Sequence, residues 1–126
     1  MYPEDLKYSK DHEWVRLDGD ECVFGITDFA QGELGEVVYV ELPEIGESYE
    51  AGDEIGTIES VKAVAEVFAP IDGEVVAVND SLADAPEKVN DDPHGEGWLV
   101  RVKTSSADAL GELMDASGYR EFVDGD

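Results

Sequence analysis

A single lysine stands out in the middle of the chain. The stretch 56–70 reads GTIESVKAVAEVFAP, and Lys62 is the only Lys or Arg between residues 17 and 87. Its side chain is a long stem that ends in an amine, and this amine can be acylated. Group carriers such as lipoamide and biotin supply chemistry that ordinary side chains lack. Lys62 is therefore a candidate attachment point, and its small neighbours Ser60 and Ala63 would leave the amine accessible.

Three local structures are compatible with this stretch. In a helix, Glu59 and Glu66 would pair with Lys62, which stabilises a helix by about 0.2–0.5 kcal/mol per pair. The density of Val and Ile, closed by Pro70, instead favours a β-hairpin over about residues 53–70. Composition does not choose between an ordinary surface lysine on a strand and a lysine displayed at the tip of this hairpin.

The overall composition bounds the function. The chain has 126 residues, of which 32 are acidic and 8 are Lys or Arg, so its net charge is −24. Nucleic acid is excluded as a partner, because phosphate binding needs clusters of Lys and Arg, and an anionic membrane surface is disfavoured for the same reason. The length and the 42% hydrophobic content predict one domain, 1–126, with its own core. The sequence shows no signal peptide, transit peptide or membrane span, so we expect a cytoplasmic protein.

Short β-strands dominate the pattern. Two similar segments, GEVVYVE at 35–41 and GEVVAVN at 73–79, predict a pair of related β units on either side of Lys62. Turn signals built from Gly, Pro and Asp separate the other strand candidates. These candidates are 12–18, 21–27, 53–60, 65–70 and 97–103. The pattern predicts a mainly β domain, either a small barrel or a sandwich.

Helix is expected at three places. Thr27 is a candidate N-cap for a short helix that Gly32 would end. One or two helical turns are expected in LADAPEKVN. A C-terminal helical segment is expected over about 105–123, with one helix at about 106–115 and a short one near 116–123.

Catalytic side-chain machinery is not visible in the sequence. There is no nucleophile-elbow motif and no phosphate-cradling glycine loop, and one Cys with two distant His is too few for a zinc site. Cys22 lies in a strand pattern, so we expect a buried structural thiol. His12 is expected to be structural or exposed, and His94, in a loop with Pro and Gly, to be solvated. We therefore expect that the protein is not an enzyme and brings no dithiol of its own.

Four blocks, in order and covering nearly the full length, resemble the glycine cleavage H-protein family of lipoyl carriers. The blocks are KYSKDHEWVR, GITDFAQGELGEVVYVELPEIG, ESVKAVAEVFAPIDGEVVAVN and VNDDPHGEGWLVRVK. The third block places Lys62 in the family's lipoylated position. The resemblance implies a lipoyl/biotinyl-carrier-like hybrid of two small antiparallel sheets (a barrel-sandwich), with short helices that include C-terminal ones.

The resemblance also implies a function and its partners. Lipoate in amide linkage to Lys62 would accept the aminomethyl group of glycine from the pyridoxal-phosphate glycine decarboxylase (P protein). The carrier would pass this group to the tetrahydrofolate-dependent aminomethyltransferase (T protein), and dihydrolipoyl dehydrogenase (L protein) would reoxidise the dithiol. A lipoylating enzyme is the fourth partner, and a mobile shuttle is expected to be a monomer.

The resemblance assigns further residues to sites. In the family the loaded arm folds back into a cleft near the His-Glu-Trp segment, where a carboxylate would hold a cationic amine by a charge-assisted hydrogen bond. Glu13, Glu66 and Asp11 fall at this cleft, although Glu66 is one methylene longer than the family's acid and Asp11 replaces a small hydroxyl residue. Glu59 falls where related lipoyl domains have an acid recognised by the lipoylating enzyme. For each of them the alternative is a solvated acid.

Other functions stay open at this stage. A biotin carrier or a lipoyl domain of a 2-oxoacid dehydrogenase would share the fold, but biotin acceptors usually place Met beside the lysine, whereas Val61 and Ala63 flank Lys62 here. A further alternative is a protein of the same fold that relays lipoate to other acceptors, or one that is never lipoylated and acts as an acidic scaffold.

The acidity yields the first testable prediction. Self-repulsion at a net charge of −24 destabilises the compact state, and salt screens it, since the screening length falls to about 3 Å at 1 M. If the chain is adapted to a halophilic, high-salt cytoplasm, its melting temperature is expected to rise with KCl concentration. Melts followed by circular dichroism across a KCl series measure this. Equal or greater stability in dilute buffer would leave solubility alone as the explanation of the charge.

Overall fold

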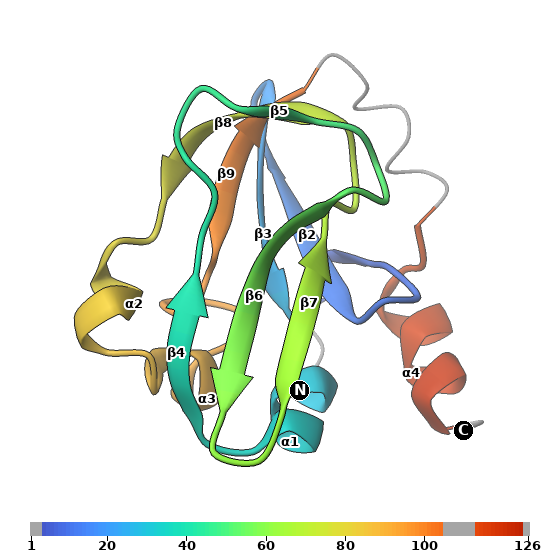
Figure 1. The fold of residues 1–126 in the computed structure, drawn as a ribbon. Helices are drawn as coiled ribbons and strands as arrows, with labels where there is room; N and C mark the ends of the chain where they lie inside the picture. Colours follow the sequence, from blue (N-terminus) through green and yellow to red (C-terminus); the bar gives the residue numbers. More distant parts are fainter. Residues whose placement is uncertain (1–3, 105–112, 125–126) are drawn as a thin grey trace.

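The computed structural model describes residues 4–104 and 113–124, which form two antiparallel β-sheets with short helices around them (Figure 1). In order across the larger sheet, the strands are β1 (Lys7–Tyr8), β2 (Glu13–Asp18), β3 (Glu21–Ile26), β9 (Val100–Lys103), β8 (Gly73–Val78) and β5 (Ser48–Tyr49). In the smaller sheet they are β4 (Val37–Glu41), β6 (Glu54–Ser60) and β7 (Val64–Phe68). The predicted mainly β fold of two small antiparallel sheets is confirmed, and the sheets are not closed into one barrel.

The two similar sequence segments lie in different sheets. β4 occupies most of 35–41 in the smaller sheet, and β8 occupies most of 73–79 in the larger one. Each segment therefore supplies one strand to one sheet.

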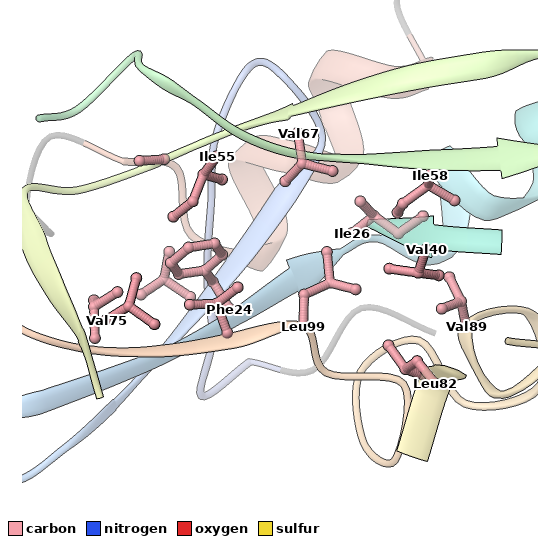
Figure 2. Close-up of a cluster of buried hydrophobic side chains, with 14 of the residues drawn as sticks. Phe24, Ile26, Val40, Ile55, Ile58, Val67, Val75, Leu82, Val89 and Leu99 are labelled. Atoms are coloured by element: carbon pink, nitrogen blue, oxygen red, sulfur yellow. The ribbon is translucent and has the colours of Figure 1, made fainter. Parts of the chain in front are cut away.

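The hydrophobic core lies between the two sheets (Figure 2). Because successive strand residues point to opposite faces, alternate residues of each strand enter this core. Phe24 of β3 belongs to the same buried cluster as Ile58 and Val67 of the smaller sheet. Cys22 lies in the same cluster as a free, buried thiol, as predicted, and burial raises its pKa.

Four short helices border the sheets in the described residues. They are α1 (Asp28–Leu34), α2 (Ser81–Asp84), α3 (Lys88–Asp91) and α4 (Ala116–Asp124). The helix predicted near 116–123 is α4, while most of the one predicted at about 106–115 lies outside the described residues. No helix among 4–104 and 113–124 is long and apolar enough to cross a membrane.

The boundaries of α1 confirm one prediction and correct another. Thr27 is the N-cap, and its Oγ1 accepts a hydrogen bond from the N–H of Ala30 at 3.2 Å. The predicted stop at Gly32 is wrong, because α1 runs through it and ends at Gly35. A glycine inside a helix costs only roughly 0.5–1 kcal/mol relative to Ala, so it weakens a helix without ending it. Gly35 has a φ of 83°, and its N–H bonds to the carbonyl of Gln31 at 3.0 Å.

Helix α4 packs on the outer face of the larger sheet, away from the main core. A second buried cluster forms there from Leu6, Tyr8, Trp14, Val23, Ala116 and Tyr119. The backbones of Tyr8 and Met114 exchange two hydrogen bonds of 2.8 Å, which fix the entry to α4 against β1. The C-terminal helix is thus held to the sheet by both backbone pairing and apolar packing.

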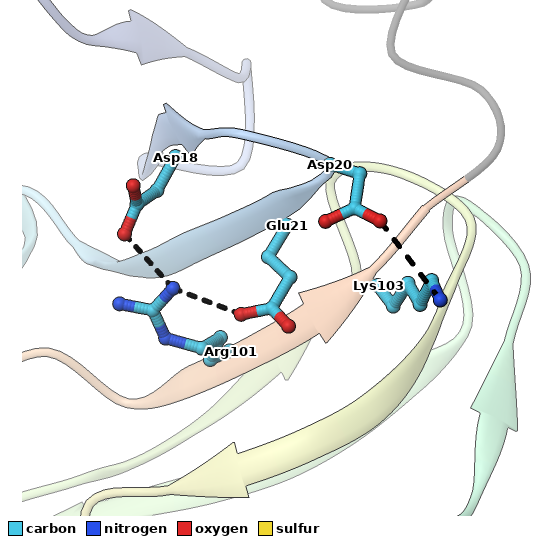
Figure 3. Close-up of polar contacts among 5 residues, drawn as sticks. All are labelled: Asp18, Asp20, Glu21, Arg101 and Lys103. Carbon is cyan, nitrogen blue, oxygen red and sulfur yellow. Dashed lines mark hydrogen bonds and ion pairs between the residues drawn. The ribbon is translucent and has the colours of Figure 1, made fainter.

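The ion pairs of the described residues gather at one end of the larger sheet (Figure 3). Arg101 lies 3.0 Å from both Asp18 and Glu21, and Lys103 lies 3.9 Å from Asp20. This end carries the β2–β3 turn and is opposite to the end that carries the β6–β7 turn (Figure 1). Such exposed pairs contribute about 0–1 kcal/mol each, so we assign them a minor role in stability.

Candidate functional site

Lys62 is the middle residue of the three-residue turn, 61–63, that joins β6 to β7. The N–H of Ser60 donates to the carbonyl of Ala63 at 2.8 Å, and Ser60 Oγ accepts the N–H groups of Lys62 and Ala63 at 3.3 and 3.1 Å. The N–H of Val61 donates to the carbonyl of Glu36 at 3.0 Å, which ties the turn to the segment after α1. The backbone that carries Lys62 is therefore fixed from two sides.

The side chains of this turn are exposed. Val61 and Val64 on either side of the lysine are 67% and 65% exposed. Lys62 is exposed as well, and no described residue forms an ion pair with its amine. The structure therefore presents an exposed amine, without an ion pair to the described part of the chain, on a turn whose backbone is fixed by hydrogen bonds. A covalent attachment point needs this arrangement.

A cleft of about 330 Å³ lies between α1 and β7, beside the segment that leads into β2. Phe29 and Leu34 of α1 form one wall, and Ala65 and Val67 of β7 contribute to the other. Among the described residues that line the cleft, none is Lys or Arg and four are acidic: Asp11, Glu13, Glu33 and Glu66. Apolar walls with several carboxyl groups suit a ligand that is apolar along its length and cationic at its end.

Glu13 is the buried acid of this cleft, with only 1% of its surface exposed. Ser9 Oγ donates to Oε1 at 2.9 Å, and the N–H of Phe68 donates to Oε2 at 3.1 Å. Burial raises the pKa of Glu13 from 4.5 to about 8; the bonds from Phe68 and Ser9 act in the opposite direction, and the charge of Asp11 adds to the rise. The cleft therefore contains a carboxyl group that titrates near neutral pH.

A hydrogen-bonded chain links the C-terminal helix to this cleft. The hydroxyl of Tyr119 on α4 lies 2.7 Å from His12 Nδ1 and 2.7 Å from Thr27 Oγ1. His12 lines the cleft in an unusual backbone conformation, with a φ of 68°, and its ring lies 4.8 Å from that of Phe29. One buried hydroxyl thus holds both a cleft residue and the N-cap of the helix that forms a cleft wall.

Asn90 of α3 fixes the segment between α1 and β4. Its Nδ2 donates to the carbonyl of Gly35 at 2.8 Å and to Gln31 Oε1 at 2.9 Å, while its Oδ1 accepts the N–H of Val37 at 2.8 Å. Sequence analysis did not find this role, nor those of Ser9 or Tyr119. An Asn in a short polar stretch carries no local signal for a bond to a strand 53 residues away.

The structure brings three of the predicted acids together and leaves the fourth apart. Glu13, Glu66 and Asp11 all line the cleft, with Glu13 buried and the other two exposed. Glu66 also faces Glu54, and its charge is the main cause that raises the pKa of Glu54. Glu59 lies on the exposed face of the smaller sheet, near Lys62 but not at the cleft.

One expectation about the histidines is wrong. His94 is half-buried and not simply solvated, since its Nε2 accepts a hydrogen bond from the N–H of Asp28 at 3.2 Å and its ring lies edge-on to that of Trp14. Burial lowers the pKa of His94. The loop that contains it folds onto the start of α1, which the local Pro-Gly pattern does not reveal.

Comparison with known proteins gives a consistent result. The family model described as glycine cleavage H-protein matches residues 6–126. The glycine cleavage system H protein of Anaeromyxobacter sp. (strain K) is 53% identical over 122 residues, which covers 97% of this chain and 95% of that protein. That of Rubrobacter xylanophilus is 60% identical over 103 residues, or 82% of each chain. A crystal structure of a glycine cleavage system H protein from Mycobacterium marinum superposes with a TM-score of 0.87 at 40% identity and covers 98% of both chains.

Glu13 should give the protein a pH-dependent stability. A carboxyl whose pKa is 4.5 when unfolded and about 8 when folded binds more protons in the folded state between these values. The free energy of unfolding should therefore fall as pH rises through this window, by at most about 1.4 kcal/mol per pH unit. Urea unfolding of the wild type and Glu13→Gln between about pH 5 and 8, within this window, should show the slope only in the wild type.

The matched control is Glu33→Gln, which alters an exposed acid of the same cleft. This variant should keep the wild-type slope. Parallel profiles for the wild type and Glu13→Gln would show that Glu13 ionises as readily in the folded as in the unfolded chain.

Tyr119→Phe should remove the hydrogen bonds that hold His12 and Thr27 at the cleft while keeping the packing of the aromatic ring. The variant keeps the ring that stacks on Tyr8 at 4.8 Å but loses the hydroxyl that bridges His12 and Thr27. We expect a loss of about 1 kcal/mol in the free energy of unfolding and a shift of the His12 imidazole resonances in NMR spectra. Tyr39→Phe, at an exposed tyrosine, is the control that should change neither. Unaltered His12 resonances in Tyr119→Phe would contradict the bridging role.

Proposed function

The chain belongs to the glycine cleavage H-protein family, and on this premise we propose that Lys62 is its lipoyl attachment site. Members of this family are lipoyl carriers of the glycine cleavage system and are not themselves catalysts. The observation that carries the proposal is the position of Lys62, exposed in a rigid turn with no ion pair to a described residue. An acidic cleft with apolar walls lies beside the same hairpin, so the residues present fit a long acyl arm.

The proposed task is transport between three enzymes. Attached to Lys62, lipoate would supply the sulfur chemistry needed to carry the aminomethyl group of glycine from glycine decarboxylase (P protein) to aminomethyltransferase (T protein) and to deliver electrons to dihydrolipoyl dehydrogenase (L protein). The protein contributes the rigid turn, the cleft and the surface that these enzymes contact. Its only Cys is buried, which agrees with sulfur chemistry that resides on an attached group.

The cleft is suited to hold a cationic amine, and we assign this role to Glu13, with Asp11 and Glu66 at the exposed rim. Burial disfavours the charged form of Glu13 while the cleft is empty of cations. An amine within hydrogen-bond reach would favour the carboxylate, because opposite charges at short distance stabilise the ionised form. Entry of the amine should therefore be accompanied by release of a proton from Glu13.

The exposed face of the smaller sheet offers a contact surface for the lipoylating enzyme. Glu59 of β6 pairs with Tyr39 of β4 on one side and with Val64 of β7 on the other. Tyr39 and Val64 are large exposed apolar side chains, and Val61 continues them to the turn. An enzyme that acylates Lys62 must approach this row, so we assign Glu59 to its recognition, within an apolar surround.

Replacement of Lys62 by Arg tests the attachment site. Lys62→Arg keeps the positive charge but removes the amine that forms the amide. We expect the lipoyl mass increase to be absent from the variant and glycine oxidation by the reconstituted four-protein system to be lost. The fold should be unaffected, because an exposed substitution changes the free energy of unfolding by about 0.5 kcal/mol or less.

Lys10→Arg is the control, since it alters another exposed lysine. It should be lipoylated and active like the wild type. Full glycine oxidation with Lys62→Arg would exclude the attachment site. An intact mass without lipoate, measured on protein from its own cells, would instead favour an acidic scaffold of the same fold.

A further inference from the structure

The stem of Lys62 does not extend straight into solvent but passes closely over Gly35. A Cβ placed on Gly35 would lie 3.2 Å from Lys62 Cε, 3.8 Å from Cδ and 3.9 Å from Nζ. The first of these distances is shorter than ordinary van der Waals contact, so a methyl group there would require the stem to shift by a few tenths of an ångström. The path of the lysine thus uses space that exists because residue 35 lacks a side chain.

Gly35 is held firmly in this place. Its carbonyl accepts a hydrogen bond from Asn90, and its N–H bonds to Gln31 as the last bond of α1. The next residue, Glu36, accepts the N–H of Val61 in the lysine turn. The turn and the glycine are therefore fixed relative to one another, and the stem is the part that can move between them.

The same glycine adjoins the cleft. Glu33 and Leu34, the two residues before it, both line the cleft, and α1 forms one of its walls. Ala65 and Val67, just after the lysine turn, line the opposite wall. Gly35, over which the stem passes, therefore directly follows two residues that line the cleft, although neither Gly35 nor Lys62 itself lines it.

We infer that Gly35 is a positioning residue whose missing side chain forms the track along which the Lys62 stem, and an acyl chain on its Nζ, passes from the turn into the cleft. The inference rests on the proposed attachment site and adds to it how the arm is directed. Acylation itself needs only the exposed amine, so a side chain at position 35 should leave lipoylation intact and impair entry into the cleft.

Gly35→Ala tests the track, and Gly46→Ala is the matched control. Both glycines have positive φ, 83° and 99°, so Ala is strained at each. An added Cβ on Gly46 meets nothing within 4 Å, whereas the one on Gly35 meets the lysine. Both variants therefore have a strained backbone, but only Gly35→Ala places a methyl group against the Lys62 stem. Thermal melts establish that each variant is folded.

The measurement uses a stable probe of the arm. An ω-aminooctanoyl group, a long apolar chain with a cationic end, is attached to Lys62 by semisynthesis, and ¹H–¹⁵N spectra are compared with those of the unmodified protein. Wild type and Gly46→Ala should show shifts at the cleft residues Leu34, Ala65 and Val67, and Gly35→Ala should lose them. Equal shifts in all three proteins, or no cleft shifts in the modified wild type, would overturn the track.

A second measurement needs no variant. In the unmodified wild type, nuclear Overhauser effects are expected between the ε-methylene protons of Lys62 and the α-protons of Gly35, and their absence would also overturn the inference. The proposed function is tested separately by lipoylation and glycine oxidation. If the wild type is not lipoylated or does not support glycine oxidation, the proposed function is refuted. If the wild type is lipoylated and active but Gly35→Ala keeps the wild-type cleft shifts, only the track is refuted.

Discussion

The register of β6 between β4 and β7 is the constraint on which the site depends. Ile58 of β6 is completely buried and lies opposite Val40 on one side and Ala65 on the other. Because side chains alternate along a strand, a slip by one residue would turn Ile58 outward and bring Glu59 into the core. The cost of burying that acid fixes the register, and the register in turn places Lys62 in the turn.

Glu13 links the two sheets at the point where the cleft forms. It belongs to β2 of the larger sheet, yet its carboxyl accepts the backbone N–H of Phe68 in β7 of the smaller one. Joining two sheets through a buried carboxyl group costs free energy, because desolvation disfavours its charged form. Its partners Phe68 and Ser9 offset part of that cost. Acidic side chains prefer the solvent-exposed surface, and an exception in a concave site usually has a functional reason. Glu13, a titratable group that faces the cleft, fits this explanation.

The sequence predicts those features that local patterns encode. Alternating apolar residues and turn signals predict the strands, and Thr27 predicts the start of α1, because capping depends on neighbours in the chain. Long-range packing decides the rest. Nothing local distinguishes Glu13, which is buried, from Glu66, which is exposed, and nothing near Gly32 shows that α1 continues to Gly35. These outcomes depend on which segments meet in space, and the family resemblance, not the composition, placed Glu13 at the cleft.

The backbone of the lysine turn is fixed, whereas the Lys62 side chain is free to rotate. The turn is fixed by Ser60 from within and by Glu36 from outside, so its backbone can contribute little motion. The reach of the amine must come from the rotatable bonds of the Lys62 stem and of whatever is attached to it. Long flexible chains lose conformational entropy when they are held, so a cleft can retain one only if its path is unobstructed and its end is recognised. In the mechanism that we propose, Gly35 provides the first condition and Glu13 the second, so that a glycine without a side chain and a buried carboxyl act together.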